Sequence, residues 1–292
     1  MPLSIESIAV LGAGTMGRGI AHVAAVAGYR TRLYDVSQGV LDAARESIFK
    51  NLDKGVSLGK LDAALAEQAK SNLALHTELD PAVTGTQLVI EAIPESMALK
   101  IETFTQVAKN VSEDTIFASN TSALSITEMA AGSGRPRLFA GMHFFNPVHL
   151  MKLVEIIRGL ETSEETIRVI EDVSHRMGKT TVLVNESPGF VTSRINALIG
   201  NEAFRMLQEG VASAEDIDTA LKLGLNHPMG PFEMADLVGL DVRASILEYL
   251  HKSLGEAFRP NTLLLQYVKA GRFGRKVGRG VYEYDQDGRK KS

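Results

Sequence analysis

Gly12-Ala13-Gly14-Thr15-Met16-Gly17 decides the fold, because it fits the pattern G-x-G-x-x-G and joins a predicted strand to a predicted helix. An apolar run at residues 8–11 precedes it, and a small, Ala-rich helical segment at residues 15–27 follows it. In such a turn the first glycine permits the tight bend, the second lets a pyrophosphate approach the backbone, and the third lets the helix pack close to the strand. The stretch therefore predicts a dinucleotide site at a helix N-terminus, where unpaired N–H groups attract phosphate.

A second predicted strand, residues 31–35, ends at Asp35. Its distance from Gly17 matches the spacing of about 20 residues that separates the glycines of such a site from a ribose-binding carboxylate. A carboxylate at this place accepts hydrogen bonds from ribose hydroxyls and repels a 2′-phosphate, so NAD is favoured over NADP. Arg30 and Arg32 on the same strand keep NADP open, and a purely structural Gly-rich turn is the other alternative. The predicted cofactor-binding residues of this Rossmann-type domain are Gly12, Gly14, Thr15, Met16, Gly17 and Asp35.

Strand-like apolar runs continue to alternate with helical patterns, which is typical of βαβ units and a mainly parallel sheet. The runs at 138–145 and 153–157 are an exception, because the gap between them is too short for a crossover helix and predicts antiparallel pairing. A capping box, Thr162 with Glu165, predicts that a helix begins at Thr162. The other predicted strands cover residues 87–92, 115–119 and 181–184.

The pattern becomes helical after residues 185–189 and stays so to about Ala270. Ser213 with Asp216 marks one helix start in this part. The sequence therefore predicts an α/β fold, with a Rossmann-type NAD-binding domain at 1–186 and an all-α domain at 187–292.

Composition excludes several classes of protein. Lys and Arg number 31 against 35 Asp and Glu, a net charge of −4, and no basic block occurs before the last few residues, which argues against nucleic-acid binding. The chain has no cysteine, so disulfides, thiolate catalysis and Cys-ligated metals are excluded, and no metal site is predicted. No apolar stretch is long enough for a membrane-spanning helix, and the N-terminus lacks a signal-peptide pattern. We therefore expect a cytoplasmic protein that does not cross a membrane.

A nicotinamide enzyme that oxidises an alcohol needs a base for the hydroxyl proton, and histidine is the usual choice. If residues 138–157 form a hairpin centred near His149, then His143 lies opposite Glu155, the only carboxylate in an apolar run. A histidine in that place offsets the cost of burying a carboxylate, and the carboxylate fixes the imidazole and stabilises its charged form. A catalytic pair and a purely structural His–Glu pair are equally compatible with this geometry. His22 and His175, on predicted helices, are interpreted as packing or surface residues.

Several motifs resemble those of the L-3-hydroxyacyl-CoA dehydrogenases in order and spacing, and they extend over essentially the whole chain. The length, without an attached hydratase domain, resembles the stand-alone 3-hydroxybutyryl-CoA dehydrogenases. The motifs are Asn120-Thr121-Ser122, Gly141-Met142-His143-Phe144-Phe145-Asn146-Pro147-Val148, Met151-Lys152-Leu153-Val154-Glu155, His227-Pro228-Met229-Gly230-Pro231 and Phe273-Gly274-Arg275-Lys276.

The resemblance implies NAD-dependent oxidation of (S)-3-hydroxyacyl-CoA, most similar to 3-hydroxybutyryl-CoA turnover, and the reverse reduction. It implies that His143 is the general base, that Glu155 orients it, and that Ser122 bonds the substrate C3 oxygen near the nicotinamide. It implies a homodimer formed through the helical domain. The further positions that match the NAD site are Glu95, Lys100, Asn120, Asn146 and Lys276, and Asn146 also matches the substrate side.

One position departs from the family pattern. Where the family often has asparagine after Pro-Gly-Phe-Val, this chain has Ser193, which we expect to contact substrate; Asn196, about one helical turn on, is the alternative. Lys54 and Lys60 lie where the family's CoA-contacting helix should be, although a solvated helix face explains them equally well. Two other functions remain open: a dehydrogenase of a free hydroxy or sugar acid, and a non-catalytic NAD-binding protein.

Overall fold

The computed structural model describes residues 4–291 and divides the chain into two compact units, Met1–Ser187 and Pro188–Ser292. The division falls one residue after the predicted boundary. Each unit has its own hydrophobic core. Among the described residues, no helix combines the length and the apolar character needed to cross a membrane.

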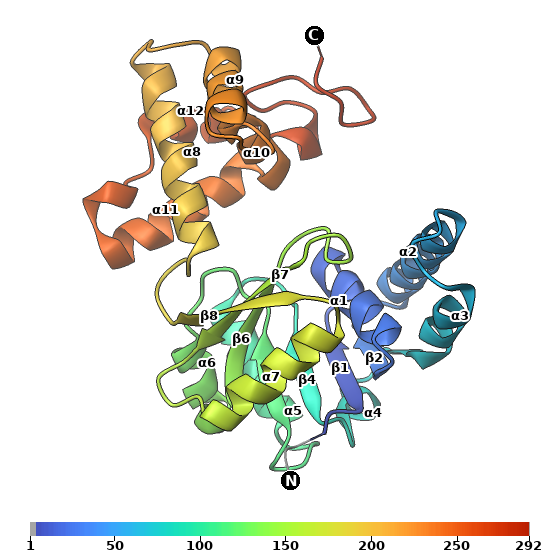
Figure 1. The fold of residues 1–292 in the computed structure, drawn as a ribbon. Helices are drawn as coiled ribbons and strands as arrows, with labels where there is room; N and C mark the ends of the chain where they lie inside the picture. Colours follow the sequence, from blue (N-terminus) through green and yellow to red (C-terminus); the bar gives the residue numbers. More distant parts are fainter. Residues whose placement is uncertain (1–3, 292) are drawn as a thin grey trace. The chain divides into compact units, whose positions relative to one another are not determined.

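The first unit is built on one eight-stranded sheet in the order β3-β2-β1-β4-β5-β6-β7-β8 (Figure 1). All neighbouring strands are parallel except β6 and β7, whose antiparallel pairing confirms the prediction from the short gap between them. No residue of β3 is buried. The strands are β1 (Ser7–Leu11), β2 (Arg30–Tyr34), β3 (Leu73–His76), β4 (Leu88–Glu91), β5 (Ile116–Ser119), β6 (Phe139–Phe144), β7 (Leu153–Arg158) and β8 (Thr180–Asn185).

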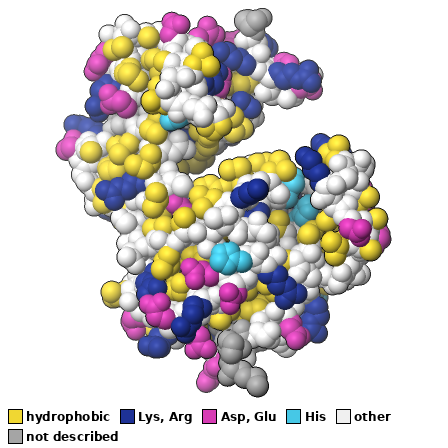
Figure 2. Space-filling view, viewed as in Figure 1, with side chains coloured by type: hydrophobic (Ala, Val, Ile, Leu, Met, Phe, Trp, Pro, Cys, Tyr) yellow, Lys and Arg dark blue, Asp and Glu magenta, His cyan; other side chains and the backbone are white. Residues whose placement is uncertain are grey.

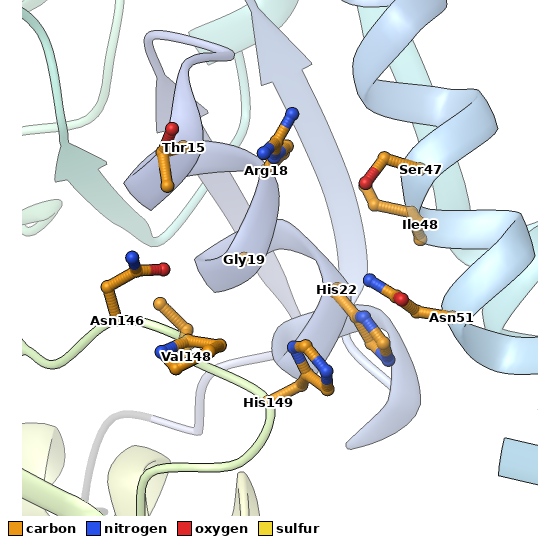
Figure 3. Close-up of a pocket in the computed structure, with 11 residues that line it drawn as sticks. Thr15, Arg18, Gly19, His22, Ser47, Ile48, Asn51, Asn146, Val148 and His149 are labelled. Carbon is orange, nitrogen blue, oxygen red and sulfur yellow. The ribbon is translucent and has the colours of Figure 1, made fainter. Parts of the chain in front are cut away.

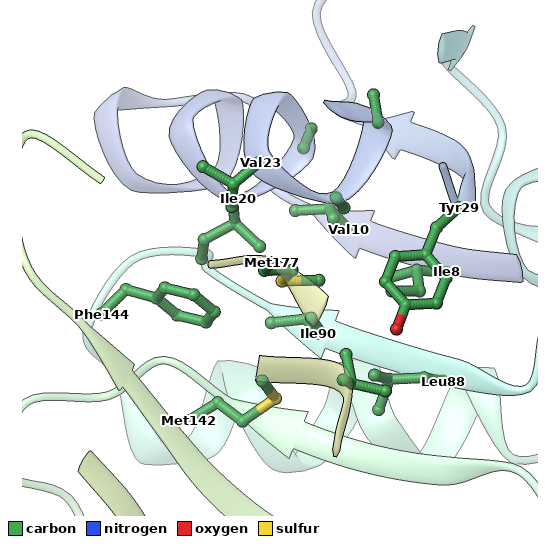
Figure 4. Packing of buried hydrophobic residues seen from close by; sticks show 14 of the residues in the cluster. Ile8, Val10, Ile20, Val23, Tyr29, Leu88, Ile90, Met142, Phe144 and Met177 are labelled. Atoms are coloured by element: carbon green, nitrogen blue, oxygen red, sulfur yellow. The ribbon is translucent and has the colours of Figure 1, made fainter. Parts of the chain in front are cut away.

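Helices cover the sheet, and the Ala-rich helix that follows the Gly-rich turn packs against its central strands. Ile20 and Val23 of this helix face Val10 of β1 and Ile90 of β4 within the main apolar cluster (Figure 4). This packing buries both central strands and so fixes where the Gly-rich turn lies. The helices of the first unit are α1 (Thr15–Val26), α2 (Gln38–Ser57), α3 (Ala63–Asn72), α4 (Leu79–Val83), α5 (Met97–Val107), α6 (Ile126–Gly132) and α7 (Glu164–Arg176), with a 3₁₀ turn at Pro136–Leu138.

The predicted start of α7 is wrong by one residue. Ser163, not Thr162, caps the helix, since its side chain accepts a hydrogen bond from the backbone N–H of Thr166. The Thr162 hydroxyl instead donates to the carbonyl of Phe139 at 2.6 Å and accepts from the N–H of Gly159. Thr162 is thus used to join β6 to the loop before α7, and the neighbouring hydroxyl takes the capping role.

The second unit is helical, with a core in which Phe204 meets Phe232 edge to face at 5.1 Å. The predicted helix start at Ser213 is confirmed, because its side chain accepts from the N–H of Asp216. The buried carboxylate of Asp236 accepts hydrogen bonds from the N–H of Tyr282 and from the Tyr284 hydroxyl, which ties the C-terminal segment to the helices. The helices are α8 (Thr192–Gln208), α9 (Ala214–Gly224), α10 (Pro231–Val238), α11 (Leu240–Leu254) and α12 (Thr262–Lys269), with 3₁₀ turns at Glu256–Phe258 and Arg275–Val277.

Candidate active site

The turn between β1 and α1 has room only for glycine at two positions. Gly12 has a φ of +94°, and a Cβ there would lie 2.7 Å from the carbonyl oxygen of Ala92. A Cβ on Gly17 would overlap the carbonyl oxygen of Gly12. Gly14 differs, because a Cβ there would meet nothing within 4 Å. The backbone at Gly14 is therefore open to a ligand, while Gly12 and Gly17 hold helix and strand together.

Asp35 lies directly beside this turn. Its carboxylate accepts from the N–H of Ala13 at 2.9 Å and from the N–H of Ser37 at 3.0 Å. The helix α1 begins at Thr15, and in the described part of the chain no side chain caps its N-terminus. Open backbone N–H groups at the start of a helix, with a carboxylate close by, suit the phosphates and the ribose of a dinucleotide. The turn also lies where β1 and β4 are neighbours and the chain order reverses, the usual ligand position in such sheets.

His143 and Glu155 are paired as the hairpin register predicted. They are direct partners in the β6–β7 ladder, and His143 Nδ1 lies 2.7 Å from a carboxylate oxygen of Glu155. Glu155 is fully buried and His143 is 7% exposed. Because a carboxylate only accepts hydrogen bonds, Nδ1 carries the hydrogen, and in the neutral ring the lone pair then lies on Nε2. His143 is close to the carboxyl end of β6, which runs parallel to β1, so it lies at the same sheet edge as the Gly-rich turn.

A polar network follows β4 and β5 at this edge. The Glu95 carboxylate accepts from the Thr121 hydroxyl at 2.5 Å and from the N–H of Ser122 at 3.0 Å, and the Ser122 hydroxyl lies 3.4 Å away. Lys100 is almost fully buried, with its ammonium 2.5 Å from Glu91 and 3.2 Å from Glu95. Burial raises the pKa of Glu91, while the nearby ammonium opposes that shift. The ammonium of Lys100 therefore pairs with Glu95 inside the protein and is not exposed to solvent.

Comparisons with known proteins agree with this geometry. Residues 7–187 match the family model described as "3-hydroxyacyl-CoA dehydrogenase, NAD binding domain", and residues 189–284 match "3-hydroxyacyl-CoA dehydrogenase, C-terminal domain". The chain belongs to the 3-hydroxyacyl-CoA dehydrogenase family. The first unit is thus the NAD-binding domain of this family, and the protein is an NAD-dependent oxidoreductase.

Relatives match along nearly their whole length. A probable 3-hydroxybutyryl-CoA dehydrogenase of Bacillus subtilis is 46% identical over 97% of this chain and 99% of its own. The human mitochondrial hydroxyacyl-coenzyme A dehydrogenase is 40% identical over 96% of this chain and 91% of its own. The crystal structure of (S)-3-hydroxybutyryl-CoA dehydrogenase from Ralstonia eutropha has a TM-score of 0.93 and 43% identity, covering 97% of this chain and all of the other.

Two asparagines lie near the dehydrogenase site. Asn120 follows β5, and its side-chain oxygen accepts from the N–H of Phe144 at 2.9 Å, which fixes β5 against β6 beside His143. Asn146 is exposed in the loop after β6, where it precedes a cis peptide bond to Pro147. Asn120 thus bonds the backbone of β6, and contacts of Asn120 and Asn146 with a ligand remain predictions.

The other predicted site residues are distributed over both units. Ser193 and Asn196 are half-buried in the first turns of α8, and the exposed Lys276 is paired with Asp241 at 2.6 Å, all within the second unit. Lys54 is exposed on α2, and Lys60 is exposed in the turn after it. The roles of these residues stay predictions.

A pocket in the first unit, between α1, α2 and the loop after β6, was not evident from the sequence (Figure 3). His22, interpreted from the sequence as a packing residue, lines this pocket and stacks on His149. A signal was present, since residues 15, 18, 19 and 22 recur on one face of α1. The lining residues are Thr15, Arg18, Gly19, His22, Ser47, Ile48, Asn51, Asn146, Pro147, Val148 and His149.

Proposed function

We propose that this protein oxidises (S)-3-hydroxyacyl-CoA esters, with (S)-3-hydroxybutyryl-CoA as a short-chain substrate, to 3-ketoacyl-CoA, and that it catalyses the reverse reduction. The observation that carries the proposal is the buried His143–Glu155 pair, at 2.7 Å, on the sheet edge that also holds the Gly-rich turn. A base is needed beside the cofactor, and a partner carboxylate stabilises the imidazolium formed when that base takes a proton. The names of the full-length relatives support the choice of substrate.

In the proposed oxidation, Nε2 of His143 accepts the proton of the C3 hydroxyl. Glu155 holds the ring through Nδ1 and balances its new positive charge. The Ser122 hydroxyl bonds the C3 oxygen, and Glu95 keeps the Ser122 backbone in place. NAD, when bound, accepts the hydride that leaves C3. In the reduction, protonated His143 returns the proton to the C3 oxygen. Positioning and proton transfer by these side chains account for catalysis.

The residues proposed to hold NAD are those of the Gly-rich turn, Asp35 for the ribose, and the polar groups at the ends of β5 and β6. They fit the cofactor because the backbone at Gly14 is open and the α1 N–H groups lack a capping side chain in the described chain. Lys276 is proposed for the same cofactor. For the substrate we propose Asn146, Ser193 with Asn196 as its alternative, and Lys54 and Lys60 toward CoA.

We further propose a homodimer formed through the helical unit. Exposed apolar side chains on α8 and around α9 support this, since such groups are usually covered in an assembly; examples are Ile195, Leu223 and Leu225. We place the protein in the cytoplasm because acyl-CoA esters and NAD are intracellular metabolites. The net negative charge gives no support to nucleic acid as a partner.

The test is the oxidation of NADH with acetoacetyl-CoA, run beside NADPH and beside free acetoacetate. Turnover of the CoA ester with NADH is expected, and similar turnover of the free acid would instead support the dehydrogenase of a free hydroxy acid. His143→Gln should lower kcat by about 10²–10⁴-fold with NADH affinity little changed. His175→Gln, at an exposed position on α7, is the matched control. Activity of His143→Gln near that of this control would refute the role of His143 as base.

A further inference from the structure

The helical unit buries an arginine that has no ion pair. Arg243, near the start of α11, is 3% exposed. In the described part of the chain no carboxylate pairs with its guanidinium, and its Nε is buried without a hydrogen-bond partner. Burial lowers the pKa of Arg243 to about 10, so the group still carries its charge at neutral pH. The buried Lys100 of the first unit, in contrast, is paired with Glu91.

The guanidinium end of Arg243 lies against α8 at a glycine. A Cβ placed on Gly200 would lie 3.8 Å from Nε and 3.9 Å from Cδ of Arg243. The guanidinium therefore occupies the direction in which position 200 would project a side chain. At the other end of the contact, a Cβ on Gly189 would lie 3.0 Å from the side chain of Leu250. The two contacts show that α8 and α11 run side by side in opposite directions.

Gly200 lies on the face of α8 that carries the proposed substrate contacts. At about 100° per residue, position 200 is about 20° around the helix from position 193 and about 40° from position 196. Ser193 and Asn196 are half-buried on this face. Apolar side chains cover parts of the surface of the helical unit (Figure 2), and one of them, Ile195, is 54% exposed and about 140° from position 200. Arg243 thus borders the substrate face of α8 and not the exposed apolar face proposed for the dimer.

A buried guanidinium is stabilised best by an anion, and a carboxylate matches its paired N–H groups with two parallel hydrogen bonds. The phosphates of CoA are one source of negative charge, but Lys54 and Lys60, proposed to contact CoA, belong to the first unit. Arg243 instead lies near the residues proposed for the acyl part of the substrate. The anion that an acyl chain itself can carry is a carboxylate at its far end.

The distances suit such a chain. Gly200 lies about 10.5 Å along α8 from Ser193. A chain that carries a carboxylate three carbons beyond C3 covers about 7–8 Å from C3 to a hydrogen-bonded nitrogen. The flexible side chain of Arg243 covers the difference. Asn196, one turn before Gly200, is only half-buried, so the guanidinium lies close below the surface of this face.

We propose that Arg243 binds a carboxylate at the far end of the acyl chain, and that the enzyme therefore acts on CoA esters of 3-hydroxy dicarboxylic acids. The inference rests on the proposed function and names a substrate class for it. Arg243 gains its ion pair when such a substrate binds. Gly200 leaves the guanidinium uncovered on the side of α8, since a larger residue there would lie over it.

The first experiment compares two esters with the same number of acyl carbons. 3-Oxoadipyl-CoA ends in a carboxylate and 3-oxohexanoyl-CoA ends in a methyl group, and both are reduced with NADH. The wild type should favour the carboxylate ester in kcat/KM by at least about tenfold. Arg243→Met should lower this ratio by about tenfold to a hundredfold, the effect of losing hydrogen bonds between charged groups. The control is Arg205→Met, which removes an exposed cation of α8 that pairs with Glu202 and should keep the wild-type ratio.

Thermal unfolding measures binding without turnover. Adipyl-CoA and hexanoyl-CoA lack an oxygen at C3, so the cofactor cannot oxidise or reduce them there. Adipyl-CoA should raise the Tm of the wild type more than hexanoyl-CoA does, and Arg243→Met should remove this difference. Without ligand, Arg243→Met should unfold at the wild-type temperature or above it, because it removes a buried charge that has no partner in the described chain.

Three results would overturn the inference. They are a wild-type ratio near one, a ratio that Arg243→Met leaves unchanged, and a change of oligomeric state in Arg243→Met, which would assign the guanidinium to a carboxylate of a second copy of the chain. Failure to reduce any of the CoA esters, acetoacetyl-CoA included, would refute the proposed function instead. The difference in Tm between adipyl-CoA and hexanoyl-CoA would then still decide whether Arg243 binds a carboxylate.

Discussion

Replacing Glu155 with glutamine tests the central pair, because it removes a charge and keeps the shape. Glu155 is fully buried, and its carboxylate is 2.7 Å from Nδ1 of His143. The glutamine carbonyl can still accept a hydrogen bond from Nδ1, so the ring keeps its orientation. What Glu155→Gln loses is the negative charge that balances the imidazolium during proton transfer.

The size of this loss can be worked from the geometry. The charges on a carboxylate and an imidazolium in this contact are separated by about 4 Å, and at an effective dielectric of about 20 they attract by about 4 kcal/mol. Since about 1.36 kcal/mol corresponds to a factor of ten in rate, the upper limit is about 10³-fold. The retained hydrogen bond returns about 1 kcal/mol. We therefore expect kcat of Glu155→Gln to fall by about 10²–10³-fold.

The assay is NADH oxidation with acetoacetyl-CoA from pH 6 to pH 9. In this direction the variant should regain activity as pH falls, because lower pH restores the protonated ring that Glu155 no longer stabilises. Glu165→Gln, on the exposed side of α7, controls for the loss of one negative charge from the protein. A kcat within about threefold of wild type at every pH would refute a charge-stabilising role for Glu155, because the smallest loss expected from the geometry is about 10²-fold.

Gly17→Ala should displace the turn before α1, cost about 1–3 kcal/mol of folding free energy and weaken NADH binding measured by fluorescence. Gly14→Ala is the control for the stability measurement. Its added methyl meets nothing within 4 Å, so its free energy of unfolding should stay within about 0.5 kcal/mol of the wild-type value. Lys100→Met should leave the carboxylate of Glu91 buried without its cation and cost about 3–5 kcal/mol in urea unfolding. Adding Glu91→Gln should recover much of that loss, and no recovery would contradict a buried ion pair.

The parts of the fold that the sequence predicted are those with local rules. Strand–helix alternation and the G-x-G-x-x-G turn placed β1, α1 and β2 because each is defined by residues near in sequence. The pairing of His143 with Glu155 was also predictable, because antiparallel strands joined by a short connection have a fixed register.

Other features depended on contacts that no local pattern defines. Thr162 and Ser163 are both suited to cap α7, and the carbonyl of Phe139, at the start of β6, decides between them by taking the Thr162 hydroxyl. Lys100 shares the buried face of α5 with Phe104 and Val107, although a lysine is usually exposed. It is buried because Glu91, at the end of the central strand β4, needs a cation.

The stacking of His22 on His149 was not predictable from the sequence, because it too depends on a contact between distant segments. His22 and His149 lie in distant parts of the sequence, and neither lies in a motif that names a partner for the other. What brings them together is Gly19, whose missing side chain admits Val148, and Lys179, which holds the loop. A larger residue at position 19 would move the loop and separate the rings without changing either histidine. Gly19 is therefore the residue on which the geometry of the pocket depends, although it bears no group that could contact a ligand.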